Sequence, residues 1–461
     1  MNVSRRTGRA LRRVACALLA AAGLSALPLS HACAEGFFVT EWSARGVSLG
    51  AGITGGMVAR ADDASAMAYN PAGITQIPGT MFQAGISLAM LNFDLSRHDT
   101  GKHVSSADQV FPIPHIYMTH QLNDRVWLGL ATFTRYGLGS KFPNNWGAPE
   151  PGKTPGTFPL YPGGPSLPAS GVLRSVKLLS STVNPNIAIK LNDTWSVSAG
   201  VSYTWGYLNI NQQYNVLSPY GMGHADARIH SENGYAFGWN VGVHARFNDQ
   251  WSAGFAYRAK EDMTFSGKTR FRHSGSPAVS GVMQQFLKTC DSRGKLNVPD
   301  TFVLGVMYKP LPNLSFEADL GYTVWSRYRN LSISMQNGTP QFFEQKNWKD
   351  GWTFTLGVEY RPVDWLALRA GYTYETTPLQ DSNCYDYLVP SNGRNYYTAG
   401  VGFTYGNWTL DLAYMYINVR DITYPAFGGV GKVENGIIKE YSGRAHNSYC
   451  HSAAMTIGYR F

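Results

Sequence analysis

The stretch AAMTIGYRF at residues 453–461 decides how the whole chain is interpreted. Large or apolar residues occupy every second position, and small or polar residues stand between them. A β-strand with this period of two has one apolar and one polar face. The pattern is typical of a strand in a membrane barrel, which separates lipid from a wet interior. An amphipathic strand of a soluble sandwich would show the same pattern, so the two folds are distinguished by the rest of the sequence.

Short turn signals recur along the chain and separate further alternating segments. They lie at 122–124, 191–193, 248–250, 310–313, 362–364 and 406–407. A tryptophan follows five of the six turns, at Trp127, Trp195, Trp251, Trp365 and Trp408. Tryptophan at one fixed end of successive hairpins predicts an aromatic girdle at one membrane interface.

Six turns join twelve strands in pairs, and one strand precedes and one follows them. We therefore predict an all-β fold, a 14-stranded antiparallel transmembrane β-barrel. The predicted strands are 80–95, 109–121, 125–137, 172–190, 195–212, 234–247, 251–272, 296–309, 314–335, 341–361, 365–377, 394–405, 408–422 and 447–461.

Residues 1–34 are typical of a Sec-type signal peptide, with five arginines before an apolar run and Ala32-Cys33-Ala34 at its end. Its removal would lower the formal net charge from +9 to +4, since it holds five of 39 basic and none of 30 acidic residues. That balance argues against a nucleic-acid partner. No later apolar run approaches the length of a spanning helix.

Residues 35–78 show no strand alternation and are rich in glycine and small residues. They hold too few large apolar residues for a core of their own. We expect them to lie inside the barrel as an N-terminal hatch, or plug, with the barrel itself formed by residues 79–461.

Nothing in the sequence points to catalysis or to a cofactor. A Gly-x-Ser-x-Gly run occurs once, at residues 46–50, but no alternating strand precedes it as a nucleophile elbow requires, and the histidines show no partner spacing. Cys290, Cys384 and Cys450 have no metal-ligand spacing, and one disulfide among them stays open, as does its pairing. We expect neither a metal nor an enzyme activity.

Apolar residues at helical spacing follow His273, at Val279, Val282, Met283, Phe286 and Leu287. They predict a helix that either packs on neighbouring loops or offers an apolar landing site at the mouth of the barrel. Charges predicted to face the lumen are interpreted as a paired structural network: Arg258, Glu317, Asp319, Glu359, Arg369 and Arg460.

Several short motifs together resemble the FadL family of outer-membrane transporters, from Gly36 to Phe461. They are Gly36-Phe37-Phe38, Glu41-Trp42-Ser43, Ala61-Asp62-Asp63-Ala64, Asn70-Pro71-Ala72, Tyr136-Gly137-Leu138, Phe237-Gly238-Trp239-Asn240, Leu296-Asn297-Val298-Pro299 and Trp325-Ser326. The resemblance implies a hatch containing Asn70, Pro71 and Ala72. It also implies a lateral opening of the wall at Tyr136, Gly137 and Leu138, where glycine tolerates a bend.

The same resemblance implies passive uptake of hydrophobic molecules through a lumen pocket lined by Phe37, Phe38 and Trp325. Fatty-acid members carry basic residues at places that here correspond to Ser332 and Tyr207, while Arg327 and Arg329 lie near enough in sequence to substitute. Long-chain fatty acids and neutral aromatic compounds are therefore both candidate substrates. A general porin for small polar solutes is the competing function.

The location that follows is the bacterial outer membrane. The expected partners are a hydrophobic small molecule, outer-membrane lipid and lipopolysaccharide, and the outer-membrane assembly machinery, which would read the terminal Phe461. We expect a monomer.

Overall fold

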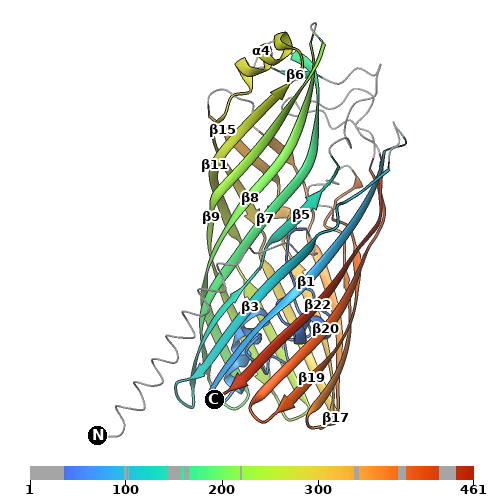
Figure 1. Ribbon diagram of the computed structural model, residues 1–461. Helices are drawn as coiled ribbons and strands as arrows, with labels where there is room; N and C mark the ends of the chain where they lie inside the picture. Colours follow the sequence, from blue (N-terminus) through green and yellow to red (C-terminus); the bar gives the residue numbers. More distant parts are fainter. Residues whose placement is uncertain are drawn as a thin grey trace.

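The computed structural model describes residues 36–97, 101, 103–143, 157–159, 166–218, 221–336, 342–382, 391–424 and 443–461. The predicted signal peptide and Cys384 lie outside these ranges. The described strands form one closed antiparallel sheet, a tall barrel whose short turns gather at one end (Figure 1). The barrel closes where β1 (Thr80–Arg97) pairs with β22 (Gly443–Arg460), which contains the alternating residues 453–460.

The sheet has 22 described strands, of which sixteen are eight residues or longer. Besides β1 and β22, the long ones are β3 (Val110–Gln121), β4 (Val126–Phe133), β7 (Ser166–Lys190), β8 (Trp195–Ser218), β9 (Gly221–Arg246), β10 (Trp251–Arg258), β11 (Glu261–Ser274), β12 (Cys290–Val298), β13 (Thr301–Leu311), β14 (Leu314–Thr323), β17 (Gly351–Val363), β18 (Leu366–Glu375), β19 (Arg394–Tyr405) and β20 (Trp408–Val419). The short ones are β2 (His103–Ser105), β5 (Gly137–Lys141), β6 (Thr157–Pro159), β15 (Asn330–Met335), β16 (Phe342–Gln345) and β21 (Ile422–Tyr424).

The predicted count of fourteen strands is wrong. Two of the predicted strands are each divided into two separate long strands in the structure. The predicted strand 251–272 divides into β10 and β11, and 296–309 divides into β12 and β13. Pro299 has no N–H for the ladder. The Asp300 carboxylate instead accepts hydrogen bonds from the Lys260 backbone N–H (3.1 Å) and the Tyr257 hydroxyl (2.7 Å). At this level of the wall, hydrogen bonds to a side chain replace the backbone hydrogen bonds between the strands. The pair β11 and β12 lies above the pair β10 and β13.

The girdle prediction is correct for four of its five tryptophans. Trp195, Trp251, Trp365 and Trp408 are 42–56 % exposed beside the short turns. Trp127 is the exception and the prediction is wrong there, because the register of β4 turns this ring inward. Its indole N–H donates to the Ile77 carbonyl at 2.8 Å.

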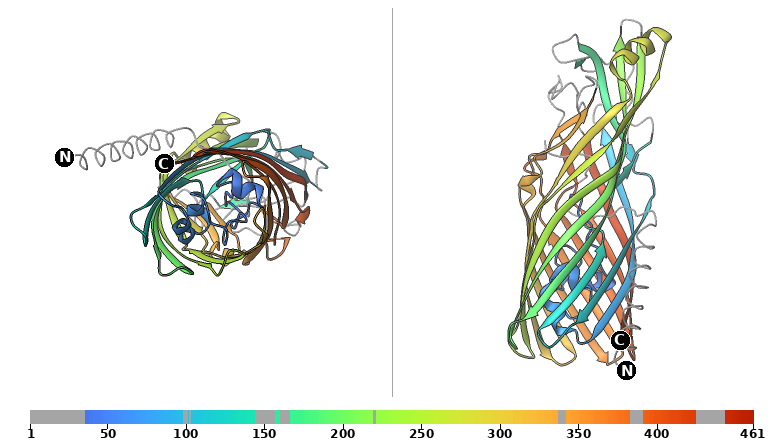
Figure 2. Two further views of the ribbon diagram at one scale, coloured as in Figure 1. Left: turned by 90° about the horizontal axis from the view of Figure 1, so that it is seen from below. Right: turned by 90° about the vertical axis from the view of Figure 1, so that its left-hand side faces the viewer.

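Residues 36–78 lie inside the ring towards the short-turn end, as seen along the barrel axis in Figure 2. They contain α2 (Ala44–Ser48), α3 (Ala66–Tyr69) and the 3-10 helix η1 (Pro71–Gln76). From Gly36 to Ile74 every residue except Asp62 is buried. We call residues 36–78 the N-terminal segment.

The helix predicted after His273 is confirmed as α4 (Pro277–Phe286). Met283 and Leu287 are buried, which favours packing over an open landing site for these two side chains. None of the described helices is both long and apolar enough to cross a membrane. Cys290 and Cys450 are both buried, and no disulfide joins these two residues.

Candidate functional site

Asn70 fixes the end of the N-terminal segment that is nearest the barrel wall. Its side-chain oxygen accepts from the Ala72 backbone N–H at 3.2 Å and so caps η1, which Pro71 begins. Its amide nitrogen donates to the carbonyls of Val58 (2.9 Å) and Val243 (3.0 Å). One buried side chain therefore links two parts of the N-terminal segment and strand β9.

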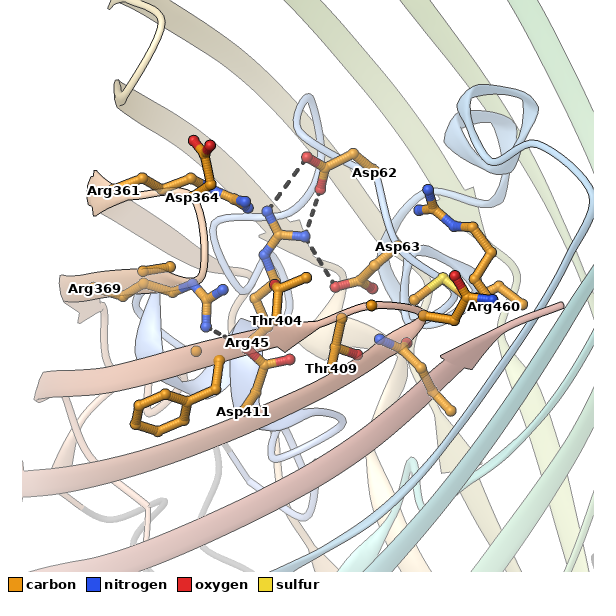
Figure 3. Close-up of a pocket in the computed structure, with 17 residues that line it drawn as sticks. Arg45, Asp62, Asp63, Arg361, Asp364, Arg369, Thr404, Thr409, Asp411 and Arg460 are labelled. Atoms are coloured by element: carbon orange, nitrogen blue, oxygen red, sulfur yellow. Dashed lines mark hydrogen bonds and ion pairs between the residues drawn. The ribbon is translucent and has the colours of Figure 1, made fainter.

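Ion pairs hold the same segment to the opposite wall, around a polar pocket of about 340 Å³ at the short-turn end (Figure 3). The Arg45 guanidinium lies 2.7 Å from Asp62, 3.1 Å from Asp63 and 3.2 Å from Glu359. Arg369 joins Glu359 (2.6 Å) to Asp411 (2.5 Å). These contacts form a closed network that anchors the segment.

A second anchor involves Glu317 of β14. Its carboxylate accepts from the backbone N–H groups of Ala59 (2.7 Å) and Arg60 (3.0 Å). The prediction of a paired lumen network is thus confirmed for Glu317, Glu359 and Arg369. Arg258 instead donates to the carbonyls of Met67 (2.6 Å) and Ala68 (2.9 Å), again binding wall to segment.

Glu41 is the acidic group of the segment whose charge is least compensated. Burial raises the pKa of Glu41 to about 7, and a hydrogen bond from the Thr40 N–H (3.0 Å) only partly offsets this. The N-terminal segment therefore contains a titration within the physiological range.

Above these anchors, aromatic rings fill the lumen. Phe37 lies 5.1 Å from Trp325, centroid to centroid, and 6.3 Å from Tyr136, while Phe38 lies 5.2 Å from Trp325 and 5.4 Å from Tyr136. Tyr328 and Trp348 complete the set, at 5.1 Å from each other. We call these six residues the aromatic cluster: Phe37, Phe38, Tyr136, Trp325, Tyr328 and Trp348.

Apolar side chains from much of the barrel surround the aromatic cluster. They include Leu178, Leu208, Ile210, Ile229, Met263, Phe265, Leu296, Val298, Leu331 and Ile333. Several belong to the upper strands β11, β12 and β15, so the apolar lining extends from the cluster towards the end opposite the short turns. The lumen at this level is therefore lined by apolar side chains.

Three polar atoms in this lining have no hydrogen-bond partner among the residues that the structure describes. The indole nitrogens of Trp325 and Trp348 and the hydroxyl of Tyr136 are buried without a hydrogen bond. Buried donors without partners are uncommon in folded proteins and call for an explanation. A ligand with an acceptor oxygen would supply one.

The wall breaks beside the cluster, between β4 and β5. β4 ends at Phe133, β5 begins at Gly137, and the described part of β3 pairs with β4 only from Ile116 onward. The N-terminal segment fills the break: Val39 N–H donates to the Arg135 carbonyl (2.8 Å), and Gly137 N–H donates to the Phe37 carbonyl (2.9 Å). Phe38 and Tyr136 form an isolated antiparallel bridge between them.

The structure thus brings together Phe37, Phe38 and Trp325 with Tyr136 and Gly137, and Leu138 packs against the same apolar lining. It places the other predicted substrate contacts elsewhere. Ser332 lies on the strand face opposite to Leu331 and Ile333. The Tyr207 ring lies 6.4 Å from the His230 ring, centroid to centroid, and is tilted to it by 56°. Arg327 is half-exposed and pairs with Asp300, and Arg329 is exposed.

Tyr328 and Trp348 were missed by sequence reasoning. Trp348 follows no strand alternation, and Tyr328 lies just after the 3-10 helix η2 (Trp325–Arg327), a break that the alternation of 314–335 concealed. The aromatic-rich run around Trp325 was the available signal.

Comparison with known proteins gives one consistent result. A family model described as "Outer membrane protein transport protein (OMPP1/FadL/TodX)" matches residues 26–155 and 164–461. The chain is 22 % identical over 431 residues to a long-chain fatty acid transport protein of Escherichia coli O6:H1, covering 87 % of this chain and 90 % of the relative. It is 24 % identical over 435 residues to outer membrane protein P1 of Haemophilus influenzae, covering 88 % and 91 %.

Solved structures show the same fold. A Pseudomonas aeruginosa FadL homologue superposes with a TM-score of 0.77 at 18 % identity, covering 92 % of this chain and all of the other. The Pseudomonas putida toluene transporter TodX superposes with a TM-score of 0.66 at 15 % identity, covering 93 % and 100 %.

Proposed function

Because the chain belongs to the outer membrane protein transport family (OMPP1/FadL/TodX), whose members are transport proteins rather than enzymes, we propose a specific route for its hydrophobic cargo. The protein is an outer-membrane transporter of hydrophobic compounds. In the proposed route, cargo enters the apolar lining from the outside, binds at the aromatic cluster, and leaves through the break between β4 and β5. Burial of apolar surface, at about 25 cal/mol per Å², drives binding, so the route is passive.

The aromatic cluster is the observation that carries this proposal. Rings from the N-terminal segment (Phe37, Phe38), the wall break (Tyr136) and the η2 region (Trp325) meet there. The ligand site, the segment that blocks the lumen and the gap in the wall are therefore one contiguous unit. A ligand that displaces Phe37 and Phe38 also removes the strand-like contacts that fill the break.

We propose that residues 36–78 act as the hatch, with Asn70, Pro71 and Ala72 as its fixed point. The anchors at Asn70, Arg45 and Glu317 hold the lower part of the segment to three different strands. The part from Gly36 to Val39 makes no ion pair among the described residues. It is held by the backbone bonds at the break, by the aromatic cluster and by a hydrogen bond from the Gly36 N–H to the Ser391 hydroxyl (3.2 Å). Cargo would thus move the first few residues and leave the rest in place.

The cargo we propose is a hydrophobic chain with an acceptor oxygen, with long-chain fatty acids as the first example. The unpartnered indole N–H groups of Trp325 and Trp348 support this class. A relative that covers most of the chain is named a long-chain fatty acid transport protein, in line with this choice.

Neutral aromatic compounds are the second candidate, favoured by a different observation. The Arg135 guanidinium lies 4.9 Å from the Tyr136 ring centre but already pairs with Glu261 at 2.5 Å. It is therefore not available as a counter-ion for a carboxylate without breaking a buried ion pair.

Binding of oleate, oleyl alcohol and toluene to the purified protein in detergent separates these candidates. We expect Trp325→Phe, which keeps a smaller aromatic ring and removes the donor, to weaken oleate binding about tenfold and to change toluene binding much less. Trp365→Phe in the outer girdle is the matched control. Equal oleate affinity of wild type and Trp325→Phe, with tighter toluene binding, would establish the second candidate.

A further inference from the structure

The wall of the barrel is much taller on one side than a membrane requires. β7, β8 and β9 have 25, 24 and 26 residues, whereas a transmembrane strand needs about 9–11. Together with β11 and β12 they extend beyond the rest of the barrel on the side away from the short turns (Figure 1). Since short turns of such barrels are periplasmic, the extension lies on the extracellular side.

Six cations stand on the outward face of this extension. Their neighbours along each strand, such as Leu178, Ile229 and Thr269, are buried on the opposite, lumen-facing side. All six are exposed. We call them the cationic patch: Lys177, Arg228, Lys268, Arg270, Arg272 and Arg293.

The pairing register concentrates these charges. Arg228 of β9 and Arg270 of β11 are direct cross-strand partners, and Lys268 stands opposite His230 in the next pair on the same face. Like charges directly opposite each other destabilise a sheet. Arg293 is the partner of Ser266, one step further down the same face.

Two carboxylates share this face with the six cations: Asp291 is the cross-strand partner of Lys268, and Asp226 is the partner of Arg272. Within the described part of the chain, Lys268, Arg270, Arg272 and Arg293 take part in no ion pair. Arg228 donates to the neutral Asn211 side chain at 3.1 Å. Asp226 is engaged by Arg174 at 3.0 Å. Six cations beside two carboxylates leave an excess of positive charge on this face, which indicates that an external anion compensates it.

The patch also has the shape of a site. Four cations line one hollow of about 700 Å³ and outnumber its one carboxylate, Asp291: they are Arg228, Lys268, Arg270 and Arg293. Guanidinium groups bind phosphate oxygens through paired N–H donors, and several converge here.

The height of the cationic patch above the lipid-facing surface indicates which phosphate-bearing molecule it can reach. Tyr235, Phe237 and Trp239 of β9 are 50–70 % exposed and mark the upper end of the lipid-facing surface. Thr264 is the partner of Tyr235, and Lys268 lies four residues beyond it, about 13 Å along the strand. The patch begins where the charged headgroups of the outer leaflet lie.

We propose that the cationic patch binds the phosphate groups of lipopolysaccharide, the anionic glycolipid of the outer leaflet, on the outside of the barrel wall. The anion would relieve the repulsion between Arg228 and Arg270 and fix the tall side of the barrel in the leaflet. This inference is independent of the cargo that the lumen carries.

Lipopolysaccharide binding to the full-length protein in detergent tests the proposal, with the enzymatically dephosphorylated glycolipid as the second ligand. We expect wild type to bind the phosphorylated form at least tenfold more tightly, and this preference to shrink with added salt. In the Arg228→Gln/Arg270→Gln variant the preference should be lost. The matched control, Lys190→Gln/Arg246→Gln, removes two exposed cations beside the short turns and should keep it.

Thermal unfolding of the same variants without glycolipid shows that a loss of binding is not a loss of folding. Because the substitution removes a like-charge pair, Arg228→Gln/Arg270→Gln should unfold at the same temperature as wild type or higher. Equal affinity of wild type for both glycolipids, or an unchanged preference in a folded Arg228→Gln/Arg270→Gln variant, would overturn the proposal.

Discussion

Single residues decide how closely the N-terminal segment and the wall approach each other. Gly254 of β10 faces the lumen where Val58 and Asn70 lie, and a Cβ there would be 2.0 Å from the Val58 carbonyl oxygen and 2.7 Å from the Asn70 amide nitrogen. Either the segment or the strand would have to move. The close approach that Asn70 needs for its hydrogen bonds depends on this glycine.

Gly254→Ala should therefore loosen the segment without unfolding the barrel. Overpacking of this kind typically costs about 1–3 kcal/mol, and we expect faster amide hydrogen exchange in residues 57–76. Gly281→Ala is the control, since a Cβ at that position in α4 meets no atom within 4 Å. Unchanged exchange in Gly254→Ala would contradict the close packing.

The buried Glu41 should make the segment's attachment depend on pH. Its pKa is raised from 4.5 to about 7 by burial, which corresponds to about 3 kcal/mol of local stability. This stability is present below pH 4.5 and is lost as the pH rises through 7. We expect residues 38–42 to exchange faster at pH 8 than at pH 5, after correction for intrinsic exchange rates, and Glu41→Gln to reduce that difference. The same pH dependence in both proteins would argue against it.

The sequence predicted the outward orientation of four tryptophans correctly and that of a fifth wrongly. The alternation around Trp195, Trp251, Trp365 and Trp408 was sufficient to place these rings outside. Trp127 follows a turn in the same way, but its strand register turns it to the Ile77 carbonyl. Only the contact with the N-terminal segment, far away in sequence, reveals this.

At the scale of elements, the alternation predicted the strands of the membrane-facing belt well and the upper strands poorly. β9 begins at Gly221, whereas the predicted strand began at residue 234. The stretch from Gly221 to Asn233 is polar on its outer face, because it lies beyond the lipid. A pattern that depends on lipid contact cannot detect it.

The alternation of apolar and polar residues could not predict the breaks in the wall either. Pro299 was visible, but the role of Asp300 as a substitute ladder partner depends on Tyr257 and Lys260 from another strand. The Tyr136-Gly137-Leu138 motif was identified through a family resemblance. Its pairing with Phe37 to Val39 follows from the three-dimensional structure alone.

Locking the segment to the break should stop transport. Phe38 and Tyr136 are bridge partners, and cross-strand partners have Cα separations that suit a disulfide. In a background without Cys290, Cys384 and Cys450, we expect Phe38→Cys/Tyr136→Cys to take up radiolabelled oleate only after reduction.

The control for this experiment is a disulfide in an unbroken part of the wall. Ala413 and Ala454 are ladder partners and both buried, so Ala413→Cys/Ala454→Cys should transport equally well oxidised and reduced. Normal uptake by the oxidised Phe38→Cys/Tyr136→Cys variant would exclude the break as the exit.

At the scale of the whole molecule, the barrel is a closed wall with an obstructed lumen and an uneven rim. The N-terminal segment is bound to β9, β14 and β17 by Asn70, Glu317 and Arg45, on different sides of the ring. An obstruction fixed from several sides distinguishes this barrel from an open pore.

Planar-bilayer recordings test that distinction. We expect the full chain to show no large, steady single-channel currents, because residues 36–78 fill the lumen (Figure 2). The Gly254→Ala variant should show more frequent brief openings than Gly281→Ala. Large steady currents from wild type would instead indicate a general porin.

The most direct test of the proposed route is a crystal structure of the protein with a dibrominated long-chain fatty acid, located by the anomalous signal of bromine. We predict bromine within the apolar lining and the carboxylate beside the indole N–H of Trp325 or Trp348. Bromine found only on the outer wall of the barrel, with the aromatic cluster unchanged, would contradict it.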